Sequence, residues 1–209
     1  MLTVVLPLLA IVVAGFWGAS RFIQPAPPDK LVFSSGGEGG AYQRFAAVYA
    51  DFLGRYGIGL VEKPSAGSIE NLARLRDDSF EVDAAFVQGG TGEAREDEPL
   101  RTLGAFFYEP LWVFYRAGLV STTGKLDQVL QLKGKRIAIG GEGSGTRHLA
   151  LEILRANGIE AGNATFIDKG GLGLVDMFGK GEIDAAFVVG PTQSATVWSL
   201  LFTEGVRLM

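Results

Sequence analysis

Apolar and polar positions along the chain predict alternating strands and helices. Short β-branched or aromatic runs are typical of buried strands, and longer stretches with an apolar residue at every third or fourth position are typical of helices. Strand, helix, strand order implies parallel strands joined by right-handed crossovers. In the first half the pattern predicts strands at 30–33, 59–63 and 82–87 and helices at 42–56 and 69–76; in the second half it predicts strands at 132–139, 164–167 and 182–188 and helices at 146–157 and 172–179.

The second half of the chain repeats the first. The segment EVDAAFV at 81–87 returns as EIDAAFV at 182–188, and a glycine loop precedes the first helix of each half, at 34–40 and at 140–146. The copies are in register, because Asp83 and Asp184 are separated by the same number of residues as Gly57 and Gly158. Both aspartates are expected to form turns before buried strands. We therefore predict an α/β fold of two similar Rossmann-like lobes, at 30–112 and 113–209, with the strand-like segment 102–116 as the crossing between them.

The last residues predict one more helix, at 196–202, and a strand that has just begun at 206–209. No return crossing to the first lobe follows. Two-lobed clefts usually need that return to complete the first sheet, so we expect the C-terminal part of the fold to lie beyond this chain.

The N-terminal residues 2–19 are almost continuously apolar, over about the length that a helix needs to cross a bilayer. Trp17 and Arg21 stand where a membrane interface would lie, and a stiff proline-rich stretch follows. A signal peptide would carry basic residues before its apolar run, and none is present, although cleavage after Ser20 is compatible with the sequence. We predict a transmembrane anchor or signal segment at 1–23, a linker at 24–29, and a membrane-anchored protein that faces the periplasm or the extracellular side.

Composition excludes several classes of function. The formal net charge is −4 and no basic stripe is present, so we expect no nucleic-acid binding. The absence of cysteine removes disulfides, thiolate metal sites and cysteine nucleophiles. His148 is the one histidine, and no motif ties a serine or aspartate to it. We therefore predict no catalytic residue, no metal site and no cofactor.

The glycine loops allow two nucleotide-binding interpretations. A phosphate-binding loop requires Gly-Lys followed by Ser or Thr, and neither loop ends that way. A dinucleotide site fits better, because loop 140–146 lies between a predicted strand and helix and Asp168 ends the next strand. However, Thr146 stands where the third glycine is expected, and the first half has Lys63 in place of the acid. An NAD-dependent enzyme is one alternative, and glycine loops that only turn tightly between elements are another.

The helix starts at these loops favour a small anionic ligand. Glycine permits close approach to the backbone, and the amides of the following helix face an anion placed there. The serines of segment 65–68 and Gln88 would add polar groups to the same cleft, although the serines would equally serve as helix caps. Arg147 can pair with a carboxylate or remain a solvated surface residue. Tyr108, beside Glu109 and Trp112, lies at the presumed hinge and is predicted to form an aromatic wall.

Four segments together resemble the TAXI family: SGGEGGAY at 35–42, SAGSIENL at 65–72, LKGKR at 132–136 and GSGT at 143–146. Members are solute-binding receptors of tripartite ATP-independent periplasmic (TRAP) transporters and have the type II periplasmic binding protein fold. The resemblance extends from about Lys30 to the end of the chain. It implies a cleft for a small organic anion, such as glutamate or another amino acid or a dicarboxylate, which is handed to membrane permease subunits.

The sequence thus predicts an extracytoplasmic solute-binding protein of a TRAP-type transporter, with a membrane-tethered ligand sensor or scaffold of the same fold as an alternative. The predicted ligand-binding residues are Ser35, Gly36, Gly37, Gly39, Gly40, Tyr42, Ser65, Gly67, Ser68, Gln88, Tyr108, Gly143, Ser144, Gly145, Thr146 and Arg147.

Overall fold

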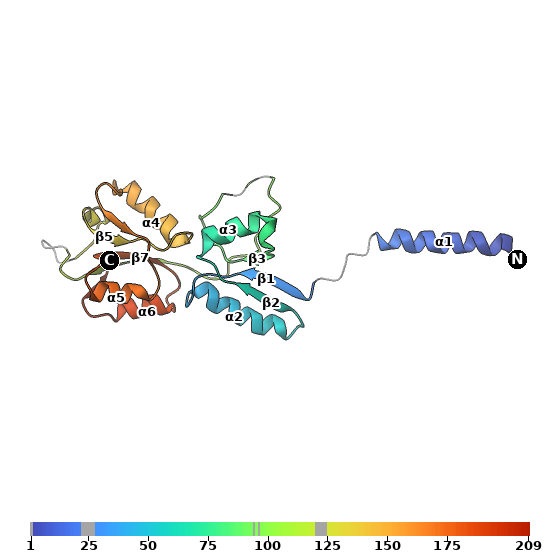
Figure 1. The fold of residues 1–209 in the computed structure, drawn as a ribbon, viewed down its shortest axis with the longest axis horizontal. Coiled ribbons are helices and arrows are strands. Elements are labelled where there is room, and N and C mark those ends of the chain that lie inside the picture. The colour runs from blue at the N-terminus through green and yellow to red at the C-terminus, as the bar shows by residue number, and fades with distance from the viewer. Residues whose placement is uncertain (1, 22–27, 94, 96, 120–124) are drawn as a thin grey trace.

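The repeated halves of the sequence fold into two α/β lobes (Figure 1). The structure is a computed structural model that describes residues 2–21, 28–93, 95, 97–119 and 125–209. The first lobe contains β1 (Lys30–Ser34), α2 (Ala41–Gly54), β2 (Gly59–Lys63), α3 (Ser68–Arg76), a 3₁₀ turn (Asp78–Phe80) and β3 (Ala84–Ala85).

The three strands of the first lobe are parallel, as the crossover argument predicts, and they lie in the order β2-β1-β3. Helices α2 and α3 cover opposite faces of this sheet (Figure 1). Phe33, Ala46 and Phe86 form the buried core on the α2 side. The third strand is shorter than the predicted 82–87, and just beyond its end the carbonyl of Phe86 accepts a hydrogen bond from the Asn71 side chain.

The second lobe repeats this arrangement. It contains β5 (Arg136–Ala138), α4 (Gly145–Ala156), β6 (Thr165–Ile167), α5 (Gly173–Gly179) and β7 (Ala185–Val189). The order β6-β5-β7 is the counterpart of β2-β1-β3, and both pairs of neighbours are parallel. The internal repeat read from the sequence is therefore a repeat of three-dimensional structure.

Two antiparallel strands extend the second sheet beyond the repeat. β4 (Leu111–Arg116) pairs with β7, and β8 (Val206–Leu208), which follows α6 (Ala195–Leu201), pairs with the outer edge of β4. The second sheet is therefore mixed, with the order β6-β5-β7-β4-β8. The predicted lobe boundary at 112/113 falls inside β4, and residues 102–110 form no strand, so the crossing between sheets precedes Leu111.

Two apolar clusters fill the second lobe, one on each face of its sheet. Neighbouring residues of a strand face opposite sides, so Phe114 and Tyr115 of β4 enter different clusters. Tyr115 packs with Leu154 of α4, whereas Phe114 packs with Leu174 of α5 and Leu200 of α6. Figure 1 shows α4 on one side of this sheet and α5 and α6 on the other.

The repeated aspartates connect strands rather than only turning the chain. The carboxylate of Asp83 accepts a hydrogen bond from the Val32 amide in β1 (2.8 Å). In the second lobe the Asp184 carboxylate accepts the Arg136 amide (2.9 Å), and both Arg136 and Arg116 donate to it through their guanidinium groups (2.8 and 2.7 Å). Burial alone would raise the pKa of Asp184, but these donors outweigh it and lower the pKa to about 2.

Acid should therefore weaken the second lobe through Asp184. The folded-state pKa lies below the unfolded value, so the stabilisation is complete above about pH 4 and is lost as the pH falls through about 2. We expect this group to contribute about 2 kcal/mol to the loss of unfolding free energy over that range. Urea unfolding between pH 5 and pH 2 measures it: Asp184→Asn should lack this component, whereas Asp83→Asn, at the equivalent position, should retain it. Equal pH profiles for wild type and Asp184→Asn would contradict the assignment.

The predicted membrane segment forms the helix α1 (Leu2–Ser20). Within the part of the chain that the structure describes, no helix has both the length and the apolar content that crossing a membrane requires. The predicted transmembrane anchor is therefore not supported. Residues 24–27 of the predicted linker lie outside the described residues.

Candidate functional site

A cleft of about 120 Å³ lies between the two lobes. It is formed where the glycine loops, the first turns of α2 and α4, and the carboxyl ends of β3 and β7 meet. Such convergence is expected, because the carboxyl ends of parallel strands lie on the same edge of a sheet and ligands of open α/β folds bind there. Its lining consists of Gly36, Gly37, Gly40, Ala41, Tyr42, Ala66, Gly67, Ser68, Gln88, Glu109, Ser144, Gly145, Thr146 and Val189.

Two helix starts reach this cleft, one from each lobe. Ala41 and Tyr42 open α2, and its N-cap, Gly40, has no side chain to satisfy the first amides. Gly145 and Thr146 open α4. The first amides of a helix have no partner within the helix and carry its partial positive charge. The cleft is therefore positively polarised from both sides, although no cationic side chain is among its described lining residues.

The start of α3, in the first lobe, already binds a carbonyl group of the second lobe. The amides of Ile69 and Glu70, in the first turn of α3, both donate to the carbonyl oxygen of Gly143 (3.1 and 3.2 Å). A second contact between the lobes joins the Arg44 guanidinium to the Gln193 carbonyl (3.1 Å). The α3 amides thus hold the lobes together and are not free to bind a ligand.

A chain of hydrogen bonds crosses the first-lobe side of the cleft. The backbone amide of Gln88 donates to the Ser68 hydroxyl oxygen (2.9 Å), which lies 3.1 Å from the Tyr42 hydroxyl oxygen. Tyr42 donates to Oε2 of Glu109 (2.8 Å). Burial, followed by the nearby Glu109 charge, raises the pKa of Tyr42, so the phenol keeps its proton and remains a donor.

Two polar side chains of the lining have unused hydrogen-bonding capacity. Among the described residues, the Gln88 side-chain amide and the Thr146 hydroxyl have no hydrogen-bond partner. An amide both donates and accepts, and a hydroxyl does the same. They can therefore complement either end of a polar solute.

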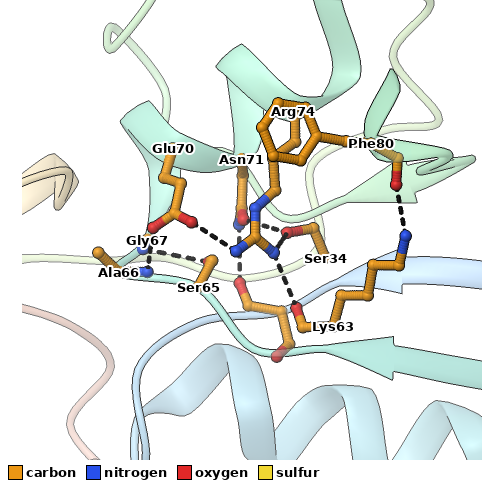
Figure 2. Close-up of polar contacts among 10 residues, drawn as sticks. Ser34, Lys63, Ser65, Ala66, Gly67, Glu70, Asn71, Arg74 and Phe80 are labelled. Carbon is orange, nitrogen blue, oxygen red and sulfur yellow. Dashed lines mark hydrogen bonds and ion pairs between the residues drawn. The ribbon is translucent and has the colours of Figure 1, made fainter. Parts of the chain in front are cut away.

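A partly buried network of hydrogen bonds supports the turn at residues 65–68 (Figure 2). The Arg74 guanidinium donates to Oε1 of Glu70 (2.5 Å), and Oε2 of Glu70 accepts the Ala66 amide (2.7 Å). The Ser65 hydroxyl accepts the Gly67 amide (3.2 Å) within the same turn. Because Ala66 and Gly67 line the cleft, this network sets the position of one of its walls.

Asn71 anchors the base of the same wall (Figure 2). Its side chain is fully buried, accepts the Ser34 hydroxyl (2.6 Å) and donates to the carbonyls of Ser35 (2.7 Å) and Phe86 (2.8 Å). The residue thus joins α3 to the ends of β1 and β3, from which the first glycine loop and Gln88 continue.

The structure brings ten of the sixteen predicted residues into the cleft lining. All of them lie at helix starts, in glycine loops or at strand ends, which are the local features that suggested them. They are Gly36, Gly37, Gly40, Tyr42, Gly67, Ser68, Gln88, Ser144, Gly145 and Thr146.

Two predicted serines lie behind the lining rather than in it. Ser35 is fully buried and donates to the Glu62 carboxylate (2.6 Å), and Ser65 is buried with its hydroxyl engaged by the Gly67 amide. Ser65 therefore closes a turn inside the loop before α3, and it does not cap that helix, because the start of α3 at Gly67 has no side-chain cap.

Four other predicted residues also lie outside the lining. Tyr108 is 94% exposed, so it forms no aromatic wall. Arg147 pairs with Asp168 (Nε to Oδ1, 2.8 Å). This ion pair engages the arginine that was predicted to bind a ligand carboxylate, and it also engages the aspartate that the dinucleotide interpretation requires. Gly39 and Gly143 lie beside the cleft in their loops but do not line it.

Sequence reasoning did not select four lining residues: Ala41, Ala66, Glu109 and Val189. The repeat contained a signal for one of them, since Val189 is separated from Gln88 by the interval that separates Asp184 from Asp83. No local pattern marks Glu109, because it stands in a crossing without regular structure.

Comparison with known proteins identifies related folds. The profile of the NMT1-like family matches residues 34–208. Among solved structures, the chain is similar to the alkanesulfonate-binding protein SsuA from Xanthomonas axonopodis pv. citri bound to MOPS (18% identity, TM-score 0.55, covering 88% of this chain and 61% of that one). It is also similar to Tv2483 bound to L-arginine (13%, TM-score 0.59, 92% and 75%). A third similar structure is the Synechocystis PCC6803 CcmR regulatory domain in complex with 2-PG (17%, TM-score 0.53, 86% and 79%). The chain spans about three fifths of the length of SsuA.

Proposed function

Because the chain belongs to the NMT1-like family, we propose that it is a solute-binding protein that holds a small polar solute between its two lobes. The observation that carries the proposal is the cleft itself, to which each repeated lobe contributes a glycine loop and a helix start. Two similarly folded proteins, SsuA and Tv2483, are bound to small solutes that carry an anionic group, MOPS and L-arginine.

The solute class that fits the two helix starts is a small organic anion, such as an amino acid or a dicarboxylate. Backbone amides and the N-terminal partial charge of a helix attract anionic groups. Here Ala41 and Tyr42, in the first turn of α2, and Gly145 and Thr146, in the first turn of α4, line one cleft from opposite lobes. Gly37 leaves room for a solute near the backbone, because an added Cβ there would meet no atom closer than 3.9 Å. Gly36 and Gly40 are required by the loop itself, because a Cβ would lie 2.9 Å from Tyr42 Cβ and 2.8 Å from the Gly37 carbonyl oxygen, respectively.

The receptor is proposed to act outside the cytoplasm and to deliver its solute to the permease subunits of a TRAP-type transporter. The order of the four TAXI-like segments supports this assignment. A ligand sensor of the same fold is the second candidate, because the CcmR regulatory domain shares the fold. Co-purification with permease subunits after solute loading distinguishes them, since a sensor would bind its solute without joining a permease.

Thermal unfolding of the full chain with a panel of solutes tests the proposal. The panel contains amino acids, dicarboxylates, alkanesulfonates and nicotinamide cofactors, each at matched ionic strength. A solute at about a hundred times its dissociation constant adds about 2.7 kcal/mol of stability, which should raise the midpoint by about 5–10 °C for a chain of this size. A shift confined to one class of small organic anion supports a receptor. A shift with a nicotinamide cofactor alone, or with no solute, would overturn the proposal.

A further inference from the structure

The charged side chain that lines the cleft is acidic, so it would repel a purely anionic solute. Glu109 is the one charged side chain among the described lining residues. The arginine nearest to this lining in sequence, Arg147, is paired with Asp168. The backbone polarises the cleft positively at the helix starts, whereas the side chains make it negative at Glu109.

The hydrogen bonds around Glu109 all point towards it. The backbone amide of Gln88 donates to the Ser68 hydroxyl oxygen, and the Tyr42 hydroxyl donates its proton to Oε2 of Glu109 (2.8 Å). Because the Tyr42 proton is used in this way, the bond between the two hydroxyls must have Ser68 as its donor and Tyr42 as its acceptor. The carboxylate is the final acceptor of this chain. Among the described residues, Tyr42 is its one hydrogen-bond partner, and no arginine or lysine is paired with it.

The half-buried carboxylate therefore lacks a compensating positive charge. Burial raises the pKa of Glu109, and the Tyr42 hydrogen bond opposes this only in part. Placing a positive group beside a desolvated carboxylate restores the attraction that burial removed. A solute that supplies such a group would gain binding free energy from the protein as it stands.

We propose that Glu109 is a specificity-determining residue that receives a cationic nitrogen of the solute, while the anionic group of the same solute lies at the starts of α2 and α4. The inference rests on the proposed solute-binding function and narrows its ligand to a zwitterion. It rejects dicarboxylates that lack a cationic nitrogen, because in a cleft of about 120 Å³ their second carboxylate would lie near Glu109 and be repelled with no positive group to offset it.

Pairs of solutes that differ by one amino group test this inference. L-glutamate is compared with glutarate, L-alanine with propionate, and the remaining standard amino acids with their deamino counterparts, by isothermal titration calorimetry on the full chain. We expect the amino member of at least one pair to bind at least tenfold more tightly than its partner. This comparison uses the unmodified protein and so does not depend on the folding of a variant.

The variant Glu109→Gln tests the residue. Glutamine keeps an oxygen that accepts the Tyr42 proton but has no charge, so the preference within the pair should fall to threefold or less. Glu109→Asp should restore part of it. Glu38→Gln removes an exposed carboxylate at the tip of the first glycine loop, outside the lining, and should leave the preference unchanged.

The outcomes separate this inference from the function on which it rests. If deamino solutes bind as tightly as their amino partners or more tightly, the receptor proposal stands and the zwitterion inference fails. If Glu109→Gln retains the full preference, the assignment to Glu109 is overturned. If neither member of any pair binds and the dicarboxylates of the wider panel also fail, both the receptor proposal for organic anions and this inference are overturned.

Discussion

Replacing Asn71 with alanine is expected to lower the free energy of unfolding by about 3–5 kcal/mol, because three buried groups each lose a hydrogen bond together. The Asn71 side chain is fully buried and bonds the Ser34 hydroxyl and the carbonyls of Ser35 and Phe86. Water cannot replace the amide without opening the packing of α3 against the sheet. Each buried group left without a partner costs about 1–3 kcal/mol.

Urea unfolding of wild type and Asn71→Ala measures this effect. Asn157→Ala is the matched control. Among the described residues, the Asn157 side chain bonds only the Ile153 carbonyl (2.8 Å), at an exposed helix end, so its loss should change stability by less than about 1 kcal/mol. If both variants unfold at the same urea concentration, Asn71 does not hold the first lobe together. A destabilised Asn71 variant should also bind solute more weakly, because the first glycine loop and Gln88 continue from the strands that it joins.

Replacing Gly145 with valine is expected to abolish solute binding, with affinity reduced at least a hundredfold, while the fold is retained. A Cβ at this position would lie 2.5 Å from Oε1 and 3.1 Å from Cδ of Gln88, and 3.1 Å from Oγ of Ser68. The Gln88 side chain is flexible and can move away, so the cost to folding is small. The displaced side-chain amide of Gln88 and the new methyl groups of the valine would, however, occupy the cleft between the lobes.

Calorimetric titration with the solute that stabilises the wild type measures the loss of binding, and circular dichroism checks the fold. Gly141→Val is the control, because a Cβ at Gly141 of the same loop meets no atom within 4 Å and Gly141 does not line the cleft. Unchanged affinity in Gly145→Val would show that the solute binds elsewhere. Loss of affinity in both variants would indicate that the loop as a whole, rather than the cleft, is sensitive.

Most of the fold followed from local patterns in the sequence. Strand and helix periodicity depends on which face of an element is buried, and that preference is written into neighbouring positions. The repeat then required both lobes to have the same order, as β2-β1-β3 and β6-β5-β7 do. The partners of β4 and β8 did not follow, because an antiparallel pairing between residues such as Phe114 and Leu208 leaves no local mark in either segment.

Some residues of the candidate site could likewise be predicted from local patterns, and others could not. Gly40, Ser68 and Gly145 could be recognised because helix starts and strand ends are local features, and the topology of parallel sheets brings them to one edge. Arg147 and Tyr108 were misplaced because the side chain of each has an environment that only the folded chain defines: an ion pair with Asp168 in one case and solvent in the other.

The sequence by itself determined two α/β repeats and a glycine loop before the first helix of each, since each depends on residues close together in the chain. Only the tertiary structure decided that Glu109 rather than Tyr108 enters the cleft, that Gly143 occupies the start of α3, and that Asn71 joins the elements behind the cleft. These features depend on contacts between residues far apart in sequence, and no period or motif encodes such contacts. The polarity of the cleft, and with it the proposed preference for a zwitterion, is therefore a property of the assembled lobes.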